Sequence, residues 1–570
     1  MHRRSAGLLR QIQGGYSVTQ EFDRRSFLAR GAVTASGLVV AGGSADLLTA
    51  ATAGAVQSNG KGLNGISTAK PKRGGTLTIG LDAEEQGFNP ASGRFDTAGF
   101  VYARTIYDPL MIINSKGQAV PYLAQSMTPN ADATEWTITM RPNIKFHDGT
   151  PCDGAALLAN INAYYNSPLV GIAIRPLIKS YEQTGPLSIK VTMFNGWTTF
   201  PITMAEQQIC FVFAPSMLKM PNQGSDHPIG TGPFVFKEWK VNDHFTAVAN
   251  KEYWRPGLPY LSQVTIKPIP DEQARAQALQ SGTIQMMHTS DPTNIKAFRG
   301  NKKWAYTNNI GTMVGSPALN CIMLNCGAAP FNDIEARRIV ATGASAAAYA
   351  KIIDQGIAAP ANGIYQPGSP YYSKTSYPTY SASKAKALAS AYAKKHGKPL
   401  AFTLNSVAAP TNLRQAQYAQ QVMKAIGVNV TIKTMQQNEL INDALAGSFQ
   451  GTEWSQFGGM SPDLNYVWFS PTTATKSGIS INMARNSDPQ IEAAFRTGMA
   501  STNAKARTAA FKKVNERLGA DIPYVWLDRT TWALVSKSNV QNWANPKTPS
   551  GQQALGQDQG TFFVTQAWIS

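Results

Sequence analysis

The feature that most constrains the fold is a strand–helix–strand pattern that begins near residue 400. Leu400, Phe402 and Leu404 alternate with other residues, as the side chains of a half-buried β-strand do. Apolar residues at helical spacing follow, and Gly427 stands where that helix is expected to end. Residues 428–432 then alternate again. Two strands joined by a helix within about 35 residues run parallel, so this half of the chain is predicted to be α/β.

Other segments support the same fold class. Asn332, followed three residues later by Glu335, resembles the capping box that opens a helix. Ser383 is expected to open another helix, which ends at Gly397. Alternating residues predict three strands in a more β-rich front part, at residues 77–81, 136–140 and 189–193.

Residues 1–55 have the composition of an export signal. Arg24 and Arg25 form a twin arginine, a weakly apolar stretch covers residues 31–50, and small residues at 51–55 offer cleavage sites. A twin arginine before a weakly apolar stretch is typical of a Tat-type signal peptide. Because glycines and an aspartate interrupt the stretch, a transmembrane anchor is the less suitable interpretation.

The cysteines bear on the compartment. The first is Cys152, so lipid attachment near the cleavage region is not expected, and the mature protein is predicted to be periplasmic or secreted, with residues 56–73 as a flexible N-terminus. Cys321 and Cys326 are five positions apart in a predicted strand, about 16 Å, which is too far for a disulfide. Pairing with Cys152 or Cys210 stays open.

Composition excludes some functions. The formal net charge is +18, which raises nucleic acid as a partner, but Lys and Arg are scattered in groups of two or three. Nucleic-acid binders concentrate basic residues on one face or arm, so no nucleic-acid partner is expected. The six histidines are isolated, and no nucleophile-elbow or P-loop motif occurs. No catalytic residue, metal site or cofactor is predicted.

Several short motifs occur in a fixed order along the chain. They are GTLTIG at 75–80, WTITMRP at 136–142, KFHDGTP at 145–151, IGTGPF at 229–234, NKEYW at 250–254 and PFNDIEAR at 330–337. Each is a weak signal alone. Their order and spacing over about residues 74–527 resemble the peptide/nickel-binding family of ABC-transporter solute-binding proteins, which includes the oligopeptide- and dipeptide-binding proteins.

The resemblance implies a two-lobed periplasmic-binding-protein fold of α/β class, with an extra subdomain inserted in the first lobe. The chain is then expected to cross between the lobes twice, near residues 309–315 and 518–523. The expected bounds are 74–310 plus 520–570 for lobe I, about 108–205 for its inserted subdomain, and 311–519 for lobe II.

The resemblance also implies a function without catalysis. The chain is expected to capture a peptide or similar small solute between two closing lobes and deliver it, as a monomer, to an ABC permease in the membrane. Two alternatives stay open: an exported hydrolase, and a binding protein for oligosaccharides or other non-peptide solutes.

Residues 453–465 resemble the family's ligand-facing loop. Peptide-binding relatives place an aspartate there to pair with the peptide amine, whereas this chain has Gly458, or by another matching Gly459, at that position. What remains is aromatic and amide in character, suited to stacking and to orienting a solute. For Trp454, packing in the core is an equal alternative, and for Trp468 it is the stronger one. The candidate ligand-binding residues are Trp454, Gln456, Phe457, Asn465 and Trp468, with Phe88, Asn89 and Trp197 on the opposite lobe.

Overall fold

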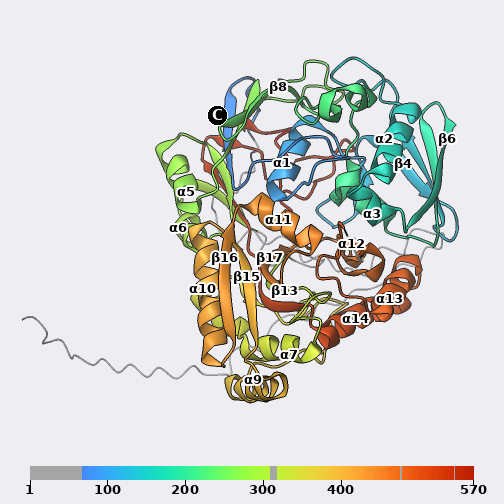
Figure 1. Ribbon diagram of the computed structural model, residues 1–570. Helices are drawn as coiled ribbons and strands as arrows, with labels where there is room; N and C mark the ends of the chain where they lie inside the picture. The colour runs from blue at the N-terminus through green and yellow to red at the C-terminus, as the bar shows by residue number, and fades with distance from the viewer. Residues whose placement is uncertain (1–66, 68, 309–317, 476–477, 545) are drawn as a thin grey trace, which may run out of the picture. The chain divides into compact units, whose positions relative to one another are not determined.

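The computed structural model describes residues 67, 69–308, 318–475, 478–544 and 546–570 (Figure 1). All of them fall in one compact unit, Leu47–Ser570. The predicted signal peptide and the predicted crossing near residues 309–315 lie outside the described residues. Two large sheets organise the described part, and we call the part built on the first sheet lobe I and the part built on the second lobe II.

Within the described residues, lobe I is built on a seven-stranded mixed sheet in the order β12-β19-β11-β1-β10-β9-β8. β1 runs parallel to β10 and β11, whereas the other pairs are antiparallel. The predicted alternation in β1 is confirmed, since Leu77, Ile79 and Leu81 are all buried. The strands are β1 Thr76–Leu81, β8 Phe234–Lys240, β9 His244–Ala249, β10 Gln263–Pro268, β11 Met286–Thr289, β12 Trp304–Asn308 and β19 Ala533–Lys537.

Aspartates begin the helices that follow the strands of lobe I. Each uses its carboxylate to accept a hydrogen bond from a backbone N–H in the first turn, which satisfies one of the unpaired donors there. The helices and their capping residues are α1 Thr97–Ile106 with Asp96, α5 Glu272–Ser281 with Asp271, and α6 Pro292–Phe298 with Asp291. Two short strand pairs complete the lobe, β2 Met111–Ile113 with β3 Ala119–Pro121, and β20 Val540–Gln541 with β21 Trp568–Ile569.

A separate four-stranded antiparallel sheet, in the order β4-β5-β7-β6, lies beside lobe I at the upper right of Figure 1. It contains the strands predicted at residues 136–140 and 189–193, and it falls inside the subdomain proposed at about 108–205. Its elements are β4 Ala124–Pro129, β5 Glu135–Met140, β6 Ile178–Gly185, β7 Ser188–Met193, α2 Gly154–Asn166, α3 Val170–Ile174 and α4 Phe200–Glu206.

Within the described residues, lobe II is built on a six-stranded sheet in the order β14-β18-β13-β17-β15-β16. The predicted strand–helix–strand unit is confirmed as β15, α10 and β16. The two strands are parallel in a register from Ala401 opposite Asn429 to Val407 opposite Met435, and α10 lies against them (Figure 1). The strands are β13 Leu319–Leu324, β14 Ala359–Pro360, β15 Ala401–Val407, β16 Asn429–Met435, β17 Gly451–Gln456 and β18 Tyr524–Arg529.

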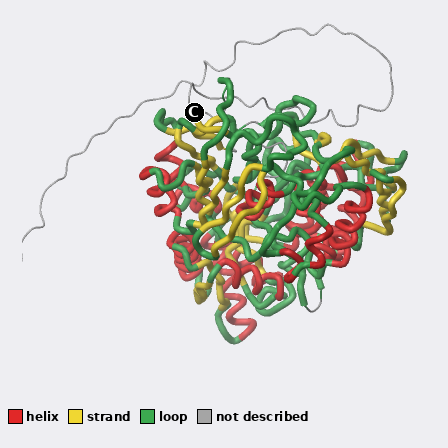
Figure 2. Tube along the Cα trace, turned by 90° about the horizontal axis from the view of Figure 1, so that it is seen from above, coloured by secondary structure: helices red, strands yellow, loops and turns green. Residues whose placement is uncertain are grey.

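The helices of lobe II begin close to the predicted positions. Asp333, not Asn332, caps α7 by accepting from the backbone N–H of Glu335, and Ser381, not Ser383, caps α9. Helices lie outside the central strands (Figure 2). They are α7 Ile334–Gly343, α8 Ala346–Ile352, α9 Ala382–His396, α10 Pro410–Ala425, α11 Gln437–Ala446, α12 Tyr466–Phe469, α13 Pro489–Ala500 and α14 Ala504–Asp521.

The second crossing between the lobes comes later than residues 518–523. β18 pairs with β13 in the sheet of lobe II, and β19 is the next strand, in the sheet of lobe I. The chain therefore passes between the lobes through residues 530–532. Because β18 is buried along its whole length, its sequence shows no alternation that would assign it to lobe II. We propose that lobe II ends at Arg529 in place of residue 519.

Cys152, Cys210, Cys321 and Cys326 are all free thiols, in agreement with the prediction that Cys321 and Cys326 do not pair. Among the described residues, no helix has the length and apolarity needed to cross a membrane.

Candidate ligand-binding site

The carboxyl ends of parallel strands from both sheets meet at one cavity. β1, β10 and β11 are parallel in lobe I, and β15 is parallel to β16 and β17 in lobe II. Residues that follow these strands, together with the first turns of α1, α5, α6, α10 and α11, line a cavity of about 300 Å³ that we call the main cavity. Open α/β sheets bind their ligands at this edge. The topology therefore points to a ligand site before any single side chain is considered.

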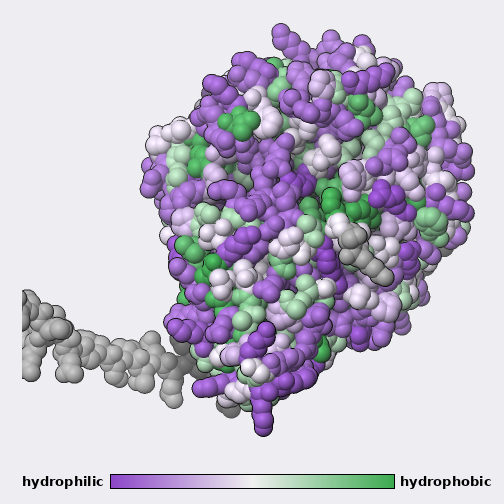
Figure 3. Space-filling view, in the orientation of Figure 1, coloured by the Kyte–Doolittle hydropathy of each residue, from purple (hydrophilic) through white to green (hydrophobic). Residues whose placement is uncertain are grey.

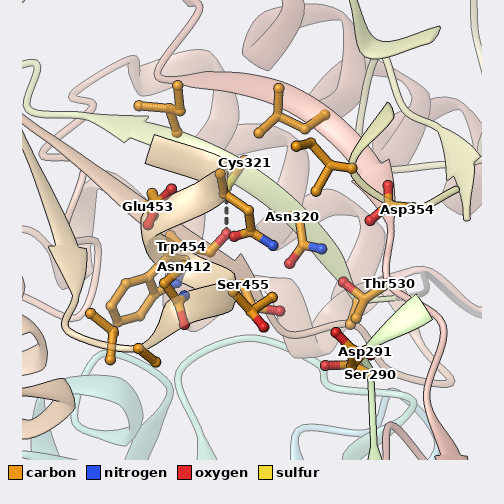
Figure 4. A pocket seen from close by; sticks show the side chains of 18 of the residues that line it. Ser290, Asp291, Asn320, Cys321, Asp354, Asn412, Glu453, Trp454, Ser455 and Thr530 are labelled. Atoms are coloured by element: carbon orange, nitrogen blue, oxygen red, sulfur yellow. Dashed lines mark hydrogen bonds between the residues drawn. The ribbon is translucent and has the colours of Figure 1, made fainter. Parts of the chain in front are cut away.

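The main cavity is lined by both apolar and polar side chains, and its described charged residues are all acidic. Amide side chains can both donate to and accept from a bound solute, and the lining includes five: Asn320, Asn412, Gln415, Gln437 and Gln559. Figure 4 shows Asp354 and Thr530 on one side of the cavity and Glu453 and Trp454 on the other. No described lining residue is Lys, Arg or His, whereas seven are acidic: Asp82, Asp96, Asp271, Glu272, Asp291, Asp354 and Glu453.

An apolar cavity of about 170 Å³, the side cavity, adjoins the main cavity. Residues of α3 and α12 line it, together with Trp197, Leu464 and Ile481. Figure 3 shows apolar residues gathered near α3 and α12 on a largely hydrophilic face. Trp454 lines both cavities, and its indole Nε1 is buried with no hydrogen-bond partner in the described part of the chain. A solute that spans the two cavities would offer that donor an acceptor.

Hydrogen bonds join the lobes around these cavities. The backbone N–H of Gly458 donates to Oε1 of Gln559 at 2.8 Å, and that of Met460 donates to Oε2 of Glu206 at 3.0 Å. The Gln437 amide donates to Asp96 Oδ2 at 2.9 Å. The main cavity therefore lies between two lobes that are in direct contact.

Four of the sequence-predicted site residues line these cavities. Trp454 lies in β17, and Phe457 follows it and lines the main cavity. Trp468 lies in α12 and lines the side cavity, with its ring centroid 5.8 Å from that of Phe457. Trp197, from the inserted subdomain, lines the opposite side of the side cavity. The structure thus brings four of the five predicted aromatic residues, from both lobes, to one region.

The other four predicted residues lie elsewhere. Phe88 packs in a buried aromatic cluster, 5.0 Å from Trp239 and 4.9 Å from Phe245 between ring centroids. Asn89 is buried and holds its own loop, because its amide donates to the carbonyl of Gln223 at 2.7 Å. Gln456 and Asn465 are also buried, and neither is among the residues that line the cavities described above.

Two acidic residues that the sequence did not single out lie in the main cavity. Ser406 Oγ donates to Glu453 Oε2 at 2.6 Å, and burial raises the pKa of Glu453 to about 8. Burial also raises the pKa of Asp354, which follows α8, to about 6. Asp354 lies just beyond the end of α8, and no local pattern marks it as part of a site. Glu453 begins the segment 453–465, but the resemblance of that segment pointed to its aromatic and amide residues and not to this carboxylate.

One cluster of metal-ligating side chains lies away from the cavities. Asp333, Glu335 and His396 approach one another at the surface of lobe II. Asp333 already caps α7, and Glu335 pairs with Lys395 at 2.9 Å. These partners account for the carboxylates, and we assign no ion to the cluster.

Residues 118–478, more than half of the chain, match the family described as bacterial extracellular solute-binding proteins, family 5 Middle. The glutathione-binding protein GsiB of Pectobacterium atrosepticum is 26% identical over 457 residues, which cover 78% of this chain and 86% of GsiB.

Two solved structures share the fold. DppA from Helicobacter pylori, in complex with the peptide STSA, superposes with a TM-score of 0.74 at 20% identity, over 87% of this chain and 98% of DppA. AgaA from A. tumefaciens R10, in complex with agropinic acid, gives 0.76 at 21% identity, over 87% of this chain and 99% of AgaA. The resemblance identified from the sequence motifs is therefore confirmed: the chain belongs to the family 5 bacterial extracellular solute-binding proteins and is a solute-binding subunit of an ABC importer rather than an enzyme.

Proposed function

We propose that this protein captures a short peptide or a peptide-like solute in the main cavity and delivers it to a membrane permease. The observation that carries the proposal is the pairing of a cavity rich in amide side chains with an apolar side cavity. Peptides have the complementary chemistry, because they alternate amide groups with side chains. GsiB is named for a tripeptide, and DppA was solved with a peptide, which supports the same class of solute.

The proposed binding residues are Trp454, Phe457, Trp468 and Trp197, together with the amides of the main cavity. Closure of the two lobes would remove the solute from water and strengthen each polar contact. It would also create a shape that a permease can distinguish from the open form. The twin-arginine signal, release into the periplasm and a monomeric state are part of the proposal.

Native mass spectrometry of freshly purified protein tests this function. We expect a bound species that denaturation releases and whose fragmentation shows amide-linked residues. If the protein carries no such species and binds no member of a tripeptide mixture by calorimetry, the proposed solute class is wrong.

Trp454→Ala tests the position of the site. The indole has a large apolar surface and an unpartnered donor at the junction of the two cavities, so its removal should weaken binding by about tenfold or more. Trp454→Phe, which keeps an aromatic ring, should lose less. Unchanged affinity in a well-folded Trp454→Ala protein would exclude the residue from the site.

A further inference from the structure

The acidic residues of the main cavity differ in how many hydrogen-bond donors and positive charges the protein itself places beside them. Asp96, Asp271 and Asp291 each cap a helix and accept a backbone hydrogen bond there. The positive ends of those helices stabilise the three charges further. Each of the three therefore has a hydrogen-bond donor within the protein. Asp291 Oδ2 accepts no hydrogen bond in the described part of the chain, but Arg414 lies 3.7 Å from it.

Two more of the acidic residues have basic side chains as partners. Asp82 lies 2.8 Å from His288, and although burial opposes ionisation, the charge and hydrogen bond of His288 lower the pKa of Asp82 to about 2. Glu272 lies 2.7 Å from Arg275. Glu453 has no described cation beside it, but it accepts the Ser406 hydroxyl.

Asp354 is the exception. It is buried, with an exposed fraction of 7%, and it lines the main cavity (Figure 4). Its Oδ2 has no hydrogen-bond partner in the described part of the chain. An unpaired buried carboxylate oxygen is costly, because the desolvation of the charge is not compensated.

The neighbour of Asp354 is a second carboxyl group. Asp528 of β18 is fully buried, accepts from Asn320 Nδ2 at 3.1 Å, and faces Asp354. Burial and the charge of Asp354 raise the pKa of Asp528 well above its usual range, as expected of two carboxyl groups that share one proton. Tyr349 of α8, also buried at the cavity, lies in the field of Asp354, Asp528 and Glu453.

The guanidinium of Arg529, whose charge acts on Asp528, donates its hydrogen bonds to other groups. Arg529, next to Asp528 in β18, donates to the backbone carbonyls of Gly363, Ile364 and Tyr365 at 3.3, 3.4 and 3.0 Å. No cation is among the described residues that line the main cavity, and none is among the groups that shift the pKa of Asp354. The chain as a whole carries a net charge of +18, so this negative pocket is a local arrangement and not a consequence of overall acidity.

We propose that Asp354, supported by Asp528 and Asn320, binds a cationic nitrogen group of the solute, an ammonium or a guanidinium. The inference rests on the proposed function and adds a charge to the solute class. A cation at this position would donate to the unpaired oxygen and replace the proton between the two carboxyl groups. The side chains and the amine of a peptide are the two sources of such a cation, and the test separates them.

Calorimetry on protein freed of its own solute provides the test. The first arm compares Ac-Ala-Arg-Ala-NH₂ with the same peptide that carries uncharged citrulline in place of Arg. The second compares free-amine Ala-Leu-Ala with its N-acetyl form. Agmatine serves as a cation that is not a peptide. In at least one arm we expect the cationic member to bind about tenfold more tightly or better, and Asp354→Asn to remove that preference.

Glu453→Gln is the matched control and should keep the preference, since it replaces another carboxyl group of the same cavity, one whose raised pKa of about 8 leaves it largely uncharged at neutral pH. Asp354→Ala, checked by thermal melting, provides a second variant should the first not fold. The preference should also decrease below pH about 6 in the wild type, because protonated Asp354 attracts a cation less.

The outcomes separate this inference from the proposed function. Peptides that bind with no preference dependent on Asp354 would overturn the cation subsite and leave the peptide-like solute standing. The cation subsite would also be overturned, and the peptide-like solute left standing, if Glu453→Gln and not Asp354→Asn removed the preference for the cationic member. Agmatine binding that depends on Asp354, with every peptide rejected, would support the subsite and contradict the peptide class. A protein that binds none of the probes contradicts both.

Discussion

Replacing Asp354 by asparagine should stabilise the ligand-free protein, and the gain should increase with pH. Burial raises the pKa of Asp354 from 3.8 to about 6 in the folded state. Between these two values the folded protein keeps a proton that the unfolded chain releases, so folding is favoured at low pH and the advantage is lost as the pH rises through about 6. At neutral pH the wild type therefore holds a charge that it would hold more easily when unfolded.

The size of the effect follows from the two pKa values. A shift of about two pH units, at about 1.4 kcal/mol per unit, corresponds to a full effect of about 3 kcal/mol. Between pH about 4.5 and about 7.5, ionisation of Asp354 lowers the free energy of unfolding of the wild type by about 2 kcal/mol of this total. The asparagine side chain of the variant does not titrate, so the variant escapes this loss of stability. Removal of the like charge beside Asp528 also stabilises the folded variant. We therefore expect the free-energy gap between Asp354→Asn and wild type to widen by about 2 kcal/mol over this range.

Urea unfolding at both pH values, followed by tryptophan fluorescence, measures the gap. Both proteins must be freed of bound solute, since a ligand stabilises the folded state by mass action. The free energy of unfolding should decrease with urea concentration at the same slope for the two proteins, and equal slopes show that their unfolded states are comparable. A gap that stays constant or narrows as the pH rises would refute the reasoning.

Two further predictions concern residues away from the cation subsite. Glu206→Ala removes the interlobe hydrogen bond to Met460 and should weaken solute binding by about two- to tenfold in calorimetry, because one hydrogen bond favours the closed form by about 0.5–1.5 kcal/mol. Glu182→Ala, at an exposed site of the inserted subdomain, is the control. Equal solute affinities of the two variants would contradict this role of Glu206. Phe88→Leu should lower the free energy of unfolding by about 1 to 2 kcal/mol, since its ring packs in an aromatic cluster, yet leave solute affinity unchanged. A loss of affinity without a loss of stability would return Phe88 to the site.

Local patterns predicted the elements of the fold well. The unit formed by β15, α10 and β16 was predicted because each of its signals lies within a few residues of the next. The end of lobe II was not predicted, because it depends on the pairing of β18 with β13, a contact between segments far apart in the sequence. β18 and β19 are separated only by residues 530–532, and only the sheet pairing assigns them to different lobes.

The candidate site divides in the same way. Trp454, Phe457 and Trp468 come from one short segment, so a motif was enough to find them. Asp354 acquires its significance from Asp528 and Asn320, which lie on other elements, and from the absence of a donor among the described residues around its Oδ2. Such a property belongs to the folded arrangement and has no counterpart in the local sequence. Phe88 and Asn89 were predicted as ligand-binding residues of the opposite lobe, but the side chain of Phe88 packs in the aromatic core and that of Asn89 holds a loop.

Small-angle X-ray scattering on the solute-loaded and solute-free protein tests the central claim most directly. If two lobes close around a solute in the main cavity, removal of the solute by unfolding and refolding should increase the radius of gyration, and the return of the extracted solute should reverse the increase. Identical scattering curves for the loaded and the emptied protein would contradict closure of the lobes around a solute.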